Sequence, residues 1–423
     1  MCGIAGQLGG SDARVPEMIA ALTHRGPDGI RTEEKAGAAL AHARLSIIDL
    51  EGGWQPLHAA GSTVIGNGEI YNYLELARDH QLQGALGTGS DFEPLLHLYA
   101  KEGEKAFERL RGMYALCLIG ADGRTWLARD PFGIKPLYIM EHAGGLAFAS
   151  EPRAFFKAGL MQTVLDDEAA RELLAFNYTL GARTMFQGLR RLAPGEVAEV
   201  CDGRIVSNWR QSWRPSPLVG EGGSPPGSAE GRPEDRLRLT DEGSHSAIAA
   251  TSTSSQLNDQ RDPSSDLLRR PPSPTRGEGQ LLAELDAVLE DSVRVHQRSD
   301  VPYGLFLSGG IDSAAIATLM ARLNERPVTA FTCGFEAPGA ADERAQAERV
   351  ARALNLDWRE TSFGEADFWR VVPQVAWALD DPTADYATLP TYKLAEAAKG
   401  TLTVVLTGEG GDELFGGYGR YRR

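Results

Sequence analysis

The first 160 residues alternate short apolar runs with glycine-rich turns, a pattern typical of many short β-strands. Helical spacing of apolar residues is rarer in this part of the chain. Strands are expected at residues 38–49, 62–67, 113–119, 125–129, 136–140 and 145–149, and helices at 16–23, 91–101 and 104–110. Many strands with few helices predict stacked antiparallel sheets with helices on their outer faces.

The composition of the chain changes after Trp213. Residues 165–177 and 196–200 still follow a helical and a strand pattern, whereas 215–280 is rich in Pro, Gly, Ser, Thr, Arg and Asp. Such a segment buries too little apolar surface to offset its chain entropy, so we expect it to be disordered. Its ends, PSPLVGEG and PSPTRGEG, nearly repeat each other, which favours a repetitive insert; a regulatory or docking linker is the alternative.

An α/β order follows the insert. Residues 281–299 place apolar side chains at helical spacing, and 301–307 is typical of a buried strand that runs through a glycine loop into a helix. Further strands are expected at 328–333, 358–363 and 402–406, and helices at 342–354 and 392–399. This order predicts a parallel sheet that binds ligands at the carboxyl ends of its strands. The expected parts are a first domain at 2–213, a disordered insert at 214–280 and a second domain at 281–423.

Composition narrows the class of protein. The 423 residues suffice for two or three domains, and a formal net charge of −15 argues against a nucleic-acid-binding surface. Four widely separated cysteines without a CxxC pair fit a reducing compartment and argue against a structural zinc. Because no stretch has the pattern of a signal peptide or membrane span, we expect a cytoplasmic protein without nucleic-acid or membrane partners.

The chain begins MCGIAG, and Cys2 is the first candidate for chemistry. An initiator methionine is normally removed before a small residue, so we expect Cys2 to become the N-terminal residue. It would then carry a thiol nucleophile beside an α-amine of pKa about 8, which can act as its base. The alternative is an ordinary buried cysteine near the start of a strand.

Polar motifs interrupt the strands of the first domain where a sheet core would not require them. Together with MCGIAG, the segments HRGPDG, RLSIID, NGEIYN and RDPFGIKPLY resemble the class II glutamine amidotransferases, in which an N-terminal cysteine hydrolyses glutamine to glutamate and ammonia. The resemblance covers residues 2–195. It implies an α+β domain of four αββα layers, of the N-terminal-nucleophile type.

The same resemblance assigns roles to individual positions. It implies that Cys2 is the nucleophile and that Arg44 binds the α-carboxylate of glutamine. It also implies an oxyanion hole formed by Asn67 and Gly68, and binding of the substrate ammonium by Glu69 and Asp91. The chemistry agrees with these residue types. A guanidinium grips a carboxylate with two hydrogen bonds, and each oxyanion-hole donor stabilises a tetrahedral intermediate by about 3 kcal/mol.

The loop SGGIDS follows the buried strand at 301–307. A strand, glycine loop and helix in this order direct backbone N–H groups and a helix N-terminus at an anion. The loop lacks the lysine of GxxxxGK[ST], so it does not match a Walker A site. It resembles the pyrophosphate loop of the ATP pyrophosphatases, which cleave ATP between the α and β phosphates.

With both halves present, the chain resembles the glutamine-hydrolysing asparagine synthetases, because SGGIDS, DDPTADY and LTGEGGDELFGGY occur in the family's order. The resemblance implies activation of aspartate by ATP to β-aspartyl-AMP, which ammonia from the first domain then attacks. The implied ATP-site residues are Phe306, Ser308, Gly309, Gly310, Asp312, Ser313, Cys333, Thr407 and Gly408, with Asp312 and Asp412 on Mg²⁺ and Glu409 handling the adenylate. Carboxylates beside ATP are sensible when a divalent cation offsets their charge; a solvated acidic loop is the alternative.

The sequence departs from this family in two ways. The family's synthetase domain continues past the GGY motif, so we expect a truncated second domain, and Thr407 stands where serine is usual. Two other functions stay open: amidation of another carboxylate, such as a cell-envelope sugar acid or a peptide, and glutamine hydrolysis alone. Small-molecule substrates are the expected partners, and a homodimer stays open.

Overall fold

The structure, a computed structural model, describes residues 1–10, 14–35, 37–211, 276–336, 339 and 342–418. The described residues before 212 and from 290 onward belong to one compact unit. The prediction of a disordered insert at 214–280 lies outside the described residues, except for its last five positions, which begin helix α6 (Arg276–His296).

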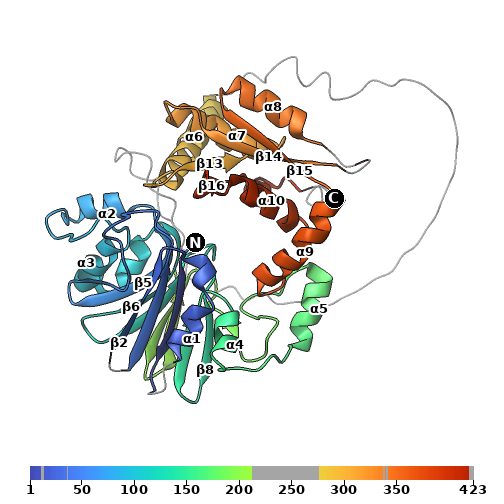
Figure 1. The fold of residues 1–423 in the computed structure, drawn as a ribbon. Coiled ribbons are helices and arrows are strands. Elements are labelled where there is room, and N and C mark those ends of the chain that lie inside the picture. The colour runs from blue at the N-terminus through green and yellow to red at the C-terminus, as the bar shows by residue number, and fades with distance from the viewer. Residues whose placement is uncertain (11–13, 36, 212–275, 337–338, 340–341, 419–423) are drawn as a thin grey trace, which may run out of the picture. The chain divides into compact units, whose positions relative to one another are not determined.

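Two six-stranded antiparallel sheets make up the first half of the chain (Figure 1). The first has the order β10-β8-β9-β1-β3-β2, and the second β12-β11-β7-β6-β5-β4. The first consists of β1 (Gly3–Leu8), β2 (Gly29–Lys35), β3 (Ala38–Arg44), β8 (Tyr138–His142), β9 (Gly145–Ala149) and β10 (Arg190–Arg191). The second consists of β4 (Leu57–Ala59), β5 (Ser62–Ile70), β6 (Gly112–Ile119), β7 (Thr125–Arg129), β11 (Glu196–Cys201) and β12 (Arg204–Arg210).

Three apolar clusters show how these sheets are layered. Ile4 and Leu40 of the first sheet share a buried cluster with Ile65 and Leu127 of the second, so the inner faces pack on each other. Helices α1 (Val15–Ala20) and α4 (Arg153–Lys157) pack on the outer face of the first sheet, and α3 (Glu93–Glu102) with the 3₁₀ helix η2 (Gly103–Arg109) on that of the second. The prediction of a four-layer αββα domain is confirmed.

The elements around these layers are short. They are the 3₁₀ helix η1 (Thr23–Arg25), α2 (Tyr73–Asp79) and α5 (Asp167–Phe176). The helix predicted at 104–110 is 3₁₀ rather than α. The edge strands β2 and β12 were not predicted, because their side chains are mostly exposed and polar and lack apolar alternation.

One predicted strand is too long. The pattern indicated a strand at 38–49, but β3 ends at Arg44. Beyond it, the Asp28 carboxylate accepts the Ser46 N–H at 2.7 Å, and the Asp300 carboxylate accepts the Asp49 N–H at 2.8 Å. These side-chain acceptors satisfy the backbone in place of a sheet partner, so the chain turns away from the sheet.

A four-stranded parallel sheet of order β15-β14-β13-β16 forms the second half (Figure 1). Its strands are β13 (Tyr303–Phe306), β14 (Thr329–Phe335), β15 (Asp357–Phe363) and β16 (Val404–Leu406), and its helices after α6 are α7 (Ile311–Leu323), α8 (Arg344–Ala353), α9 (Glu365–Leu379), α10 (Thr388–Ala398) and α11 (Gly411–Phe415). The predicted α/β order is confirmed.

Helix α9 was not predicted from the sequence. Only Val371 and Val375 of this helix are buried, while Trp369 and Trp377 are exposed and Pro373 lies in its interior. Its apolar residues therefore do not mark one face. Among the described helices, none combines the length and the apolar character needed to cross a membrane.

Phe148 tests the packing between the two inner faces. Its fully buried ring lies against Gly6, where an added Cβ would overlap it. We expect Phe148→Ala to leave a cavity and lower the free energy of unfolding by about 3–5 kcal/mol. Leu174→Ala, at a side chain 86% exposed, should change it by less than about 0.5 kcal/mol. Urea denaturation of both variants measures this, and equal losses would contradict the layered packing.

Candidate functional site

Strand alternation brings most of the predicted glutamine-site residues to the space between the sheets. Successive side chains of a strand point to opposite faces. Cys2 shares a face with Ile4 of β1, Arg44 with Leu40 of β3, and Asn67 and Glu69 with Ile65 of β5, and these three apolar residues lie in the cluster between the sheets. Asp91, from the turn before α3, reaches the same region by accepting the Ile70 N–H at 2.7 Å.

Cys2 lies directly before β1, at the centre of the first sheet. Its Sγ lies 3.4 Å from both the N–H and the carbonyl oxygen of Leu45, and burial raises the pKa of its thiol. With Met1 present, the Cys2 nitrogen is a peptide nitrogen. Burial lowers the pKa of the Met1 α-amine to about 6, so this environment favours the neutral form of an amine at pH 7.

Arg44 has spare hydrogen-bonding capacity although it is buried. One terminal nitrogen donates to the Asp49 carbonyl at 2.5 Å, while the other finds no acceptor among the described residues. The Trp54 ring lies 4.8 Å from the guanidinium carbon. Burial lowers the pKa of Arg44. A buried guanidinium with an unused donor is suited to binding a carboxylate.

Asn67 and Gly68 have the features of a paired donor site. The Asn67 side chain is 1% exposed, and neither its nitrogen nor its oxygen has a hydrogen-bond partner in the described part of the chain. Gly68 has φ +142°, and a Cβ there would overlap the carbonyl oxygen of Met113. Only glycine therefore fits this position, and the unused Asn67 amide lies next to it.

Two carboxylates complete the first site. The pKa values of Glu69 and Asp91 are both raised to about 7, mainly by burial. The nearby Glu69 carboxylate contributes to the raised pKa of Asp91. Lys135 acts in the opposite direction on Glu69. A cation placed beside these acids would relieve the cost of their burial, as the ammonium group of an amino acid would.

Sequence reasoning missed several residues around this site. Lys135 is buried, its ammonium lies 3.1 Å from the Met1 sulfur, and burial lowers its pKa. Asp130 holds the turn before it by accepting the N–H groups of Phe132, Ile134 and Lys135 at 3.0–3.1 Å. The charged segment RDPFGIKPLY was the signal that could have identified them.

His42 and Glu151 were also missed. Neither ring nitrogen of His42 has a partner among the described residues, and burial together with Arg44 lowers its pKa to about 3, so the ring is neutral. Glu151 lies 2.6 Å from Arg25. A neutral buried imidazole and a buried ion pair are not visible in the sequence pattern, because both depend on which strands pair.

The second candidate site lies at the carboxyl ends of two adjacent parallel strands. Leu305 of β13 is in register with Leu406 of β16, so the loops that follow them start side by side. The Ser313 hydroxyl accepts the Ser308 N–H at 3.1 Å and lies 2.9 Å from its hydroxyl, which holds the 308–313 loop in a tight turn. Cys333 lies two residues before the end of the adjacent parallel strand β14.

Two glycines let the second loop approach the first. A Cβ on Gly408 would lie 2.6 Å from the Ser313 nitrogen, and one on Gly411 would lie 2.5 Å from the Asp312 carboxylate. Phe306 and Gly310 flank the first loop, whereas Thr407 and Glu409 are exposed on the second. The structure therefore brings together the residues predicted from SGGIDS and TGEGGDE.

The chemistry of this edge suits an anion with a bound cation. The Gly309 N–H donates to the Glu343 carboxylate at 2.9 Å, so this amide already binds an anionic group. No group of three or more potential metal-ligating side chains occurs among the described residues. Asp312 and Asp412, one on each loop, provide two carboxylates. This donor set fits Mg²⁺, which usually takes one or two carboxylates and completes its shell with water and phosphate oxygens.

Both halves match known protein families. Residues 1–213 match the glutamine amidotransferase domain, and residues 284–423 match asparagine synthase. The whole chain is 32% identical to asparagine synthetase [glutamine-hydrolyzing] 1 of Bacillus subtilis and 34% identical to a putative asparagine synthetase [glutamine-hydrolyzing] of Mycobacterium bovis, covering 60% and 61% of those proteins. The chain is also 28% identical to asparagine synthetase B of Escherichia coli, in an alignment that covers 95% of this chain and 61% of that protein. The chain thus spans about 60% of the length of these relatives.

The raised pKa of Asp91 predicts how stability depends on pH. The folded protein keeps this carboxyl protonated up to about pH 7, whereas the unfolded chain releases the proton near its usual pKa of 3.8, so stability is lost as pH rises from about 4 to 7. Asp91→Asn removes this loss. We expect its free energy of unfolding relative to wild type to rise by about 2 kcal/mol between pH 5 and 8.

Asp79, exposed on α2, offers the matched control. The difference between Asp79→Asn and wild type should show no comparable trend with pH in the same denaturation series. If the difference in free energy of unfolding between Asp91→Asn and wild type stayed constant from pH 5 to 8, Asp91 would be ionised in the folded protein over that whole range.

Proposed function

The chain belongs to the glutamine amidotransferase domain family and carries an asparagine synthase region in the same polypeptide, and we propose on this premise that it converts aspartate to asparagine. Glutamine is the nitrogen donor, ATP the activating substrate and β-aspartyl-AMP the intermediate. The first reaction belongs to residues 2–213 and the second to residues 281–423, with 214–280 as a passive insert between them. The relatives in Bacillus subtilis and Mycobacterium bovis, a glutamine-hydrolysing asparagine synthetase and a putative one, support this assignment, and this chain spans about 60% of their length.

In the first reaction, the Cys2 thiolate attacks the side-chain amide carbon of glutamine. The C–N bond breaks with release of ammonia, and water then hydrolyses the thioester to glutamate. The α-amine freed by removal of Met1 accepts the thiol proton, which an environment that lowers an amine pKa to about 6 favours. Asn67 and Gly68 donate to the oxyanion of each tetrahedral intermediate.

The remaining residues bind and orient glutamine. Arg44 holds the α-carboxylate through its unused donor. Glu69 and Asp91 hold the α-ammonium, and a bound cation lowers the raised pKa of both acids. The observation that carries this half of the proposal is the Asn67 amide, because a buried amide without a protein partner is costly unless a ligand satisfies it.

In the second reaction, ATP lies against the carboxyl edge of the parallel sheet. The 308–313 loop holds the β and γ phosphates with backbone N–H groups at the start of α7, and Phe306, Cys333, Thr407 and Gly408 contact the nucleotide. The aspartate carboxylate attacks the α phosphorus and pyrophosphate leaves. Glu409 acts on the adenylate, and ammonia displaces AMP from it.

Asp312 and Asp412 are the residues that would hold Mg²⁺. When bound, this cation would neutralise phosphate charge that two carboxylates alone would repel. The fit between the two loops supports the assignment, because Gly408 and Gly411 leave room for the Asp312 backbone and side chain.

Substitution of Cys2 tests the first reaction. We expect Cys2→Ala to lower glutamine hydrolysis, measured as glutamate released, by about 10³-fold or more, because no other group supplies the nucleophile. Cys201→Ala, at an exposed cysteine in the same domain, should retain the wild-type rate. Mass spectrometry of the active protein should find Cys2 at the N-terminus. Hydrolysis that survives in Cys2→Ala would refute the proposal.

Substitution of Asp312 tests the second reaction. We expect wild type to exchange pyrophosphate into ATP in the presence of aspartate and Mg²⁺ and, with glutamine, to form asparagine, AMP and pyrophosphate in equal amounts. Asp312→Asn should lower the exchange by about tenfold or more while glutamine hydrolysis continues. Asp357→Asn, at the amino end of β15, removes the same charge elsewhere and should leave the exchange rate unchanged. Wild type that hydrolyses glutamine without aspartate-dependent exchange would limit the function to the first reaction.

A further inference from the structure

A row of alternating charges runs from the backbone of Cys2 to the end of helix α9. The Arg25 Nε donates to the Cys2 carbonyl oxygen at 3.0 Å, and a terminal nitrogen of Arg25 lies 2.6 Å from Glu151. The second oxygen of Glu151 lies 2.9 Å from the Arg153 Nε. Arg153 in turn lies 3.3 Å from the Asp380 carboxylate. Two guanidinium groups and two carboxylates therefore alternate along this row.

Arg153 is held from the second half of the chain. Its backbone N–H donates to Asp380 at 2.5 Å and its terminal nitrogen to the Trp377 carbonyl at 2.6 Å. Its guanidinium carbon also lies 3.9 Å from the centre of the Trp377 ring. Trp377 and Asp380 are at the end of α9 and at its C-cap, where the segment DDPTADY begins. The position of Arg153 therefore depends on this turn.

Burial makes the balance of charge along the row important. Arg25 and Glu151 are 9% and 8% exposed, and His24, 3.1 Å from Glu151, is the further titratable group beside them. A buried charge that loses its partner is costly, so a change at one end of the row is relieved by movement along it. Because the Arg25 Nε binds the Cys2 backbone, this movement ends at the nucleophile.

We propose that Glu151 and Arg153 are positioning residues for Cys2, and that through them the turn at Trp377–Asp380 in the second half controls glutamine hydrolysis in the first. This inference rests on the proposed role of Cys2 as nucleophile. Neither residue touches glutamine; both act through Arg25. A link of this kind makes ammonia release depend on the segment that leads from α9 toward the synthetase loops.

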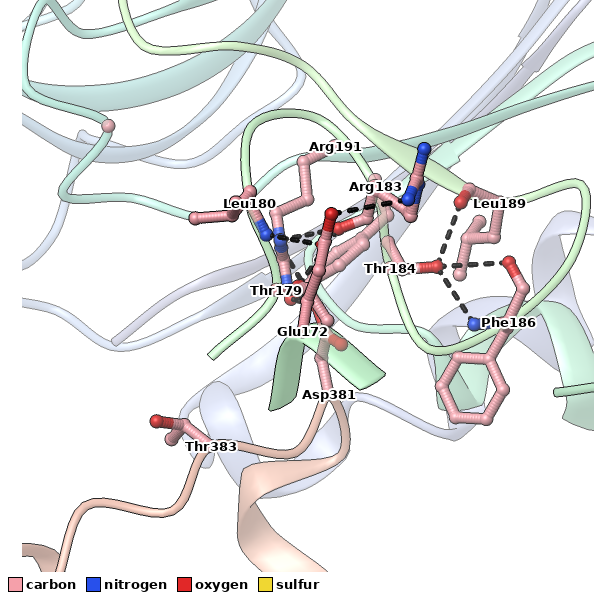
Figure 2. A network of polar contacts seen from close by, with 12 residues as sticks. Glu172, Thr179, Leu180, Arg183, Thr184, Phe186, Leu189, Arg191, Asp381 and Thr383 are labelled. Carbon is pink, nitrogen blue, oxygen red and sulfur yellow. Dashed lines mark hydrogen bonds and ion pairs between the residues drawn. The ribbon is translucent and has the colours of Figure 1, made fainter. Parts of the chain in front are cut away.

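A second contact between the same segments provides a matched control. Figure 2 shows Asp381, the residue after Asp380, bound to Arg191, whose side chain also donates to the Arg183 carbonyl at 2.6 Å. The Tyr138 hydroxyl donates to Asp381 at 3.0 Å. Asp381 and Tyr138 are buried, and the network joins the two halves of the chain as the first row does. Among the described residues, the contacts of this network given above do not lead to Arg25 or Cys2.

Glutamine hydrolysis by the full chain tests the proposal. We expect Glu151→Gln and Asp380→Asn to lower kcat by about tenfold to a hundredfold, with less than about a threefold change in KM, because the nucleophile moves while the groups that bind glutamine stay in place. Asp381→Asn should keep kcat within about twofold. Arg153→Lys, which retains the charge, should recover part of the activity lost in Arg153→Met.

Alkylation of Cys2 separates this inference from the proposed function. Iodoacetamide labelling of the N-terminal tryptic peptide reads the environment of the thiol directly, even in a protein that does not hydrolyse glutamine. We expect Glu151→Gln and Asp380→Asn to change the labelling rate by about threefold or more, and Asp381→Asn not to, at matched melting temperatures. Equal effects of Asp380→Asn and Asp381→Asn, or no effect of either, would overturn the positioning role. Glutaminase activity independent of Cys2 would instead overturn the proposed function.

Discussion

The pairing of β1 on both sides is the constraint on which the first site depends. This strand lies between β3 and β9, and the Ile4 N–H donates to the Ser150 side chain while its carbonyl accepts the Ser150 N–H, both at 2.9 Å. The first residues of a chain are usually mobile unless secondary structure holds them. Here the N-terminus starts a central strand, so a residue one position before it is held as firmly as the sheet itself.

The cost of burying polar groups explains the character of this site. Solvent hardly reaches the side chains of Arg44, Asn67, Glu69 and Asp91. Desolvation lowers the pKa of Arg44 and raises the pKa of the two acids, which favours the neutral form of each group. A protein core keeps such groups only when they are paired or when a ligand pairs them. Burial without a protein partner therefore explains both the unused donors of Arg44 and Asn67 and the raised pKa values of the two acids. Both features favour the binding of a charged, polar molecule.

The second site depends on close approach of backbones rather than on buried charge. Gly408 and Gly411 lie against Ser313 and Asp312, and any larger residue would separate the two loops. Parallel pairing of β13 and β16 sets the distance that these glycines must bridge. The Ser313 hydroxyl then holds the first loop, because it accepts the Ser308 N–H and donates to the Gly310 carbonyl, both at 3.1 Å. The row from Cys2 to Asp380 joins the first site to the turn at the end of α9.

The sequence alone determined the layered domain and the parallel sheet and predicted the residues of both sites, because alternation, glycine loops and ordered motifs are local properties of the chain. Once β3 and β5 are known, the period of two along a strand decides which of their side chains share a face. The sequence could not show that β3 ends at Arg44, because the distant side chains of Asp28 and Asp300 hold the backbone of the segment that follows. Nor could it reveal α9, in which only Val371 and Val375 are buried. The ion pairs that link Arg25, Glu151, Arg153 and Asp380 were not predicted either. The contacts of Arg25 with Glu151 and of Arg153 with Asp380 join residues more than a hundred positions apart, and only the tertiary structure decides which distant charges become neighbours and which are left without a partner.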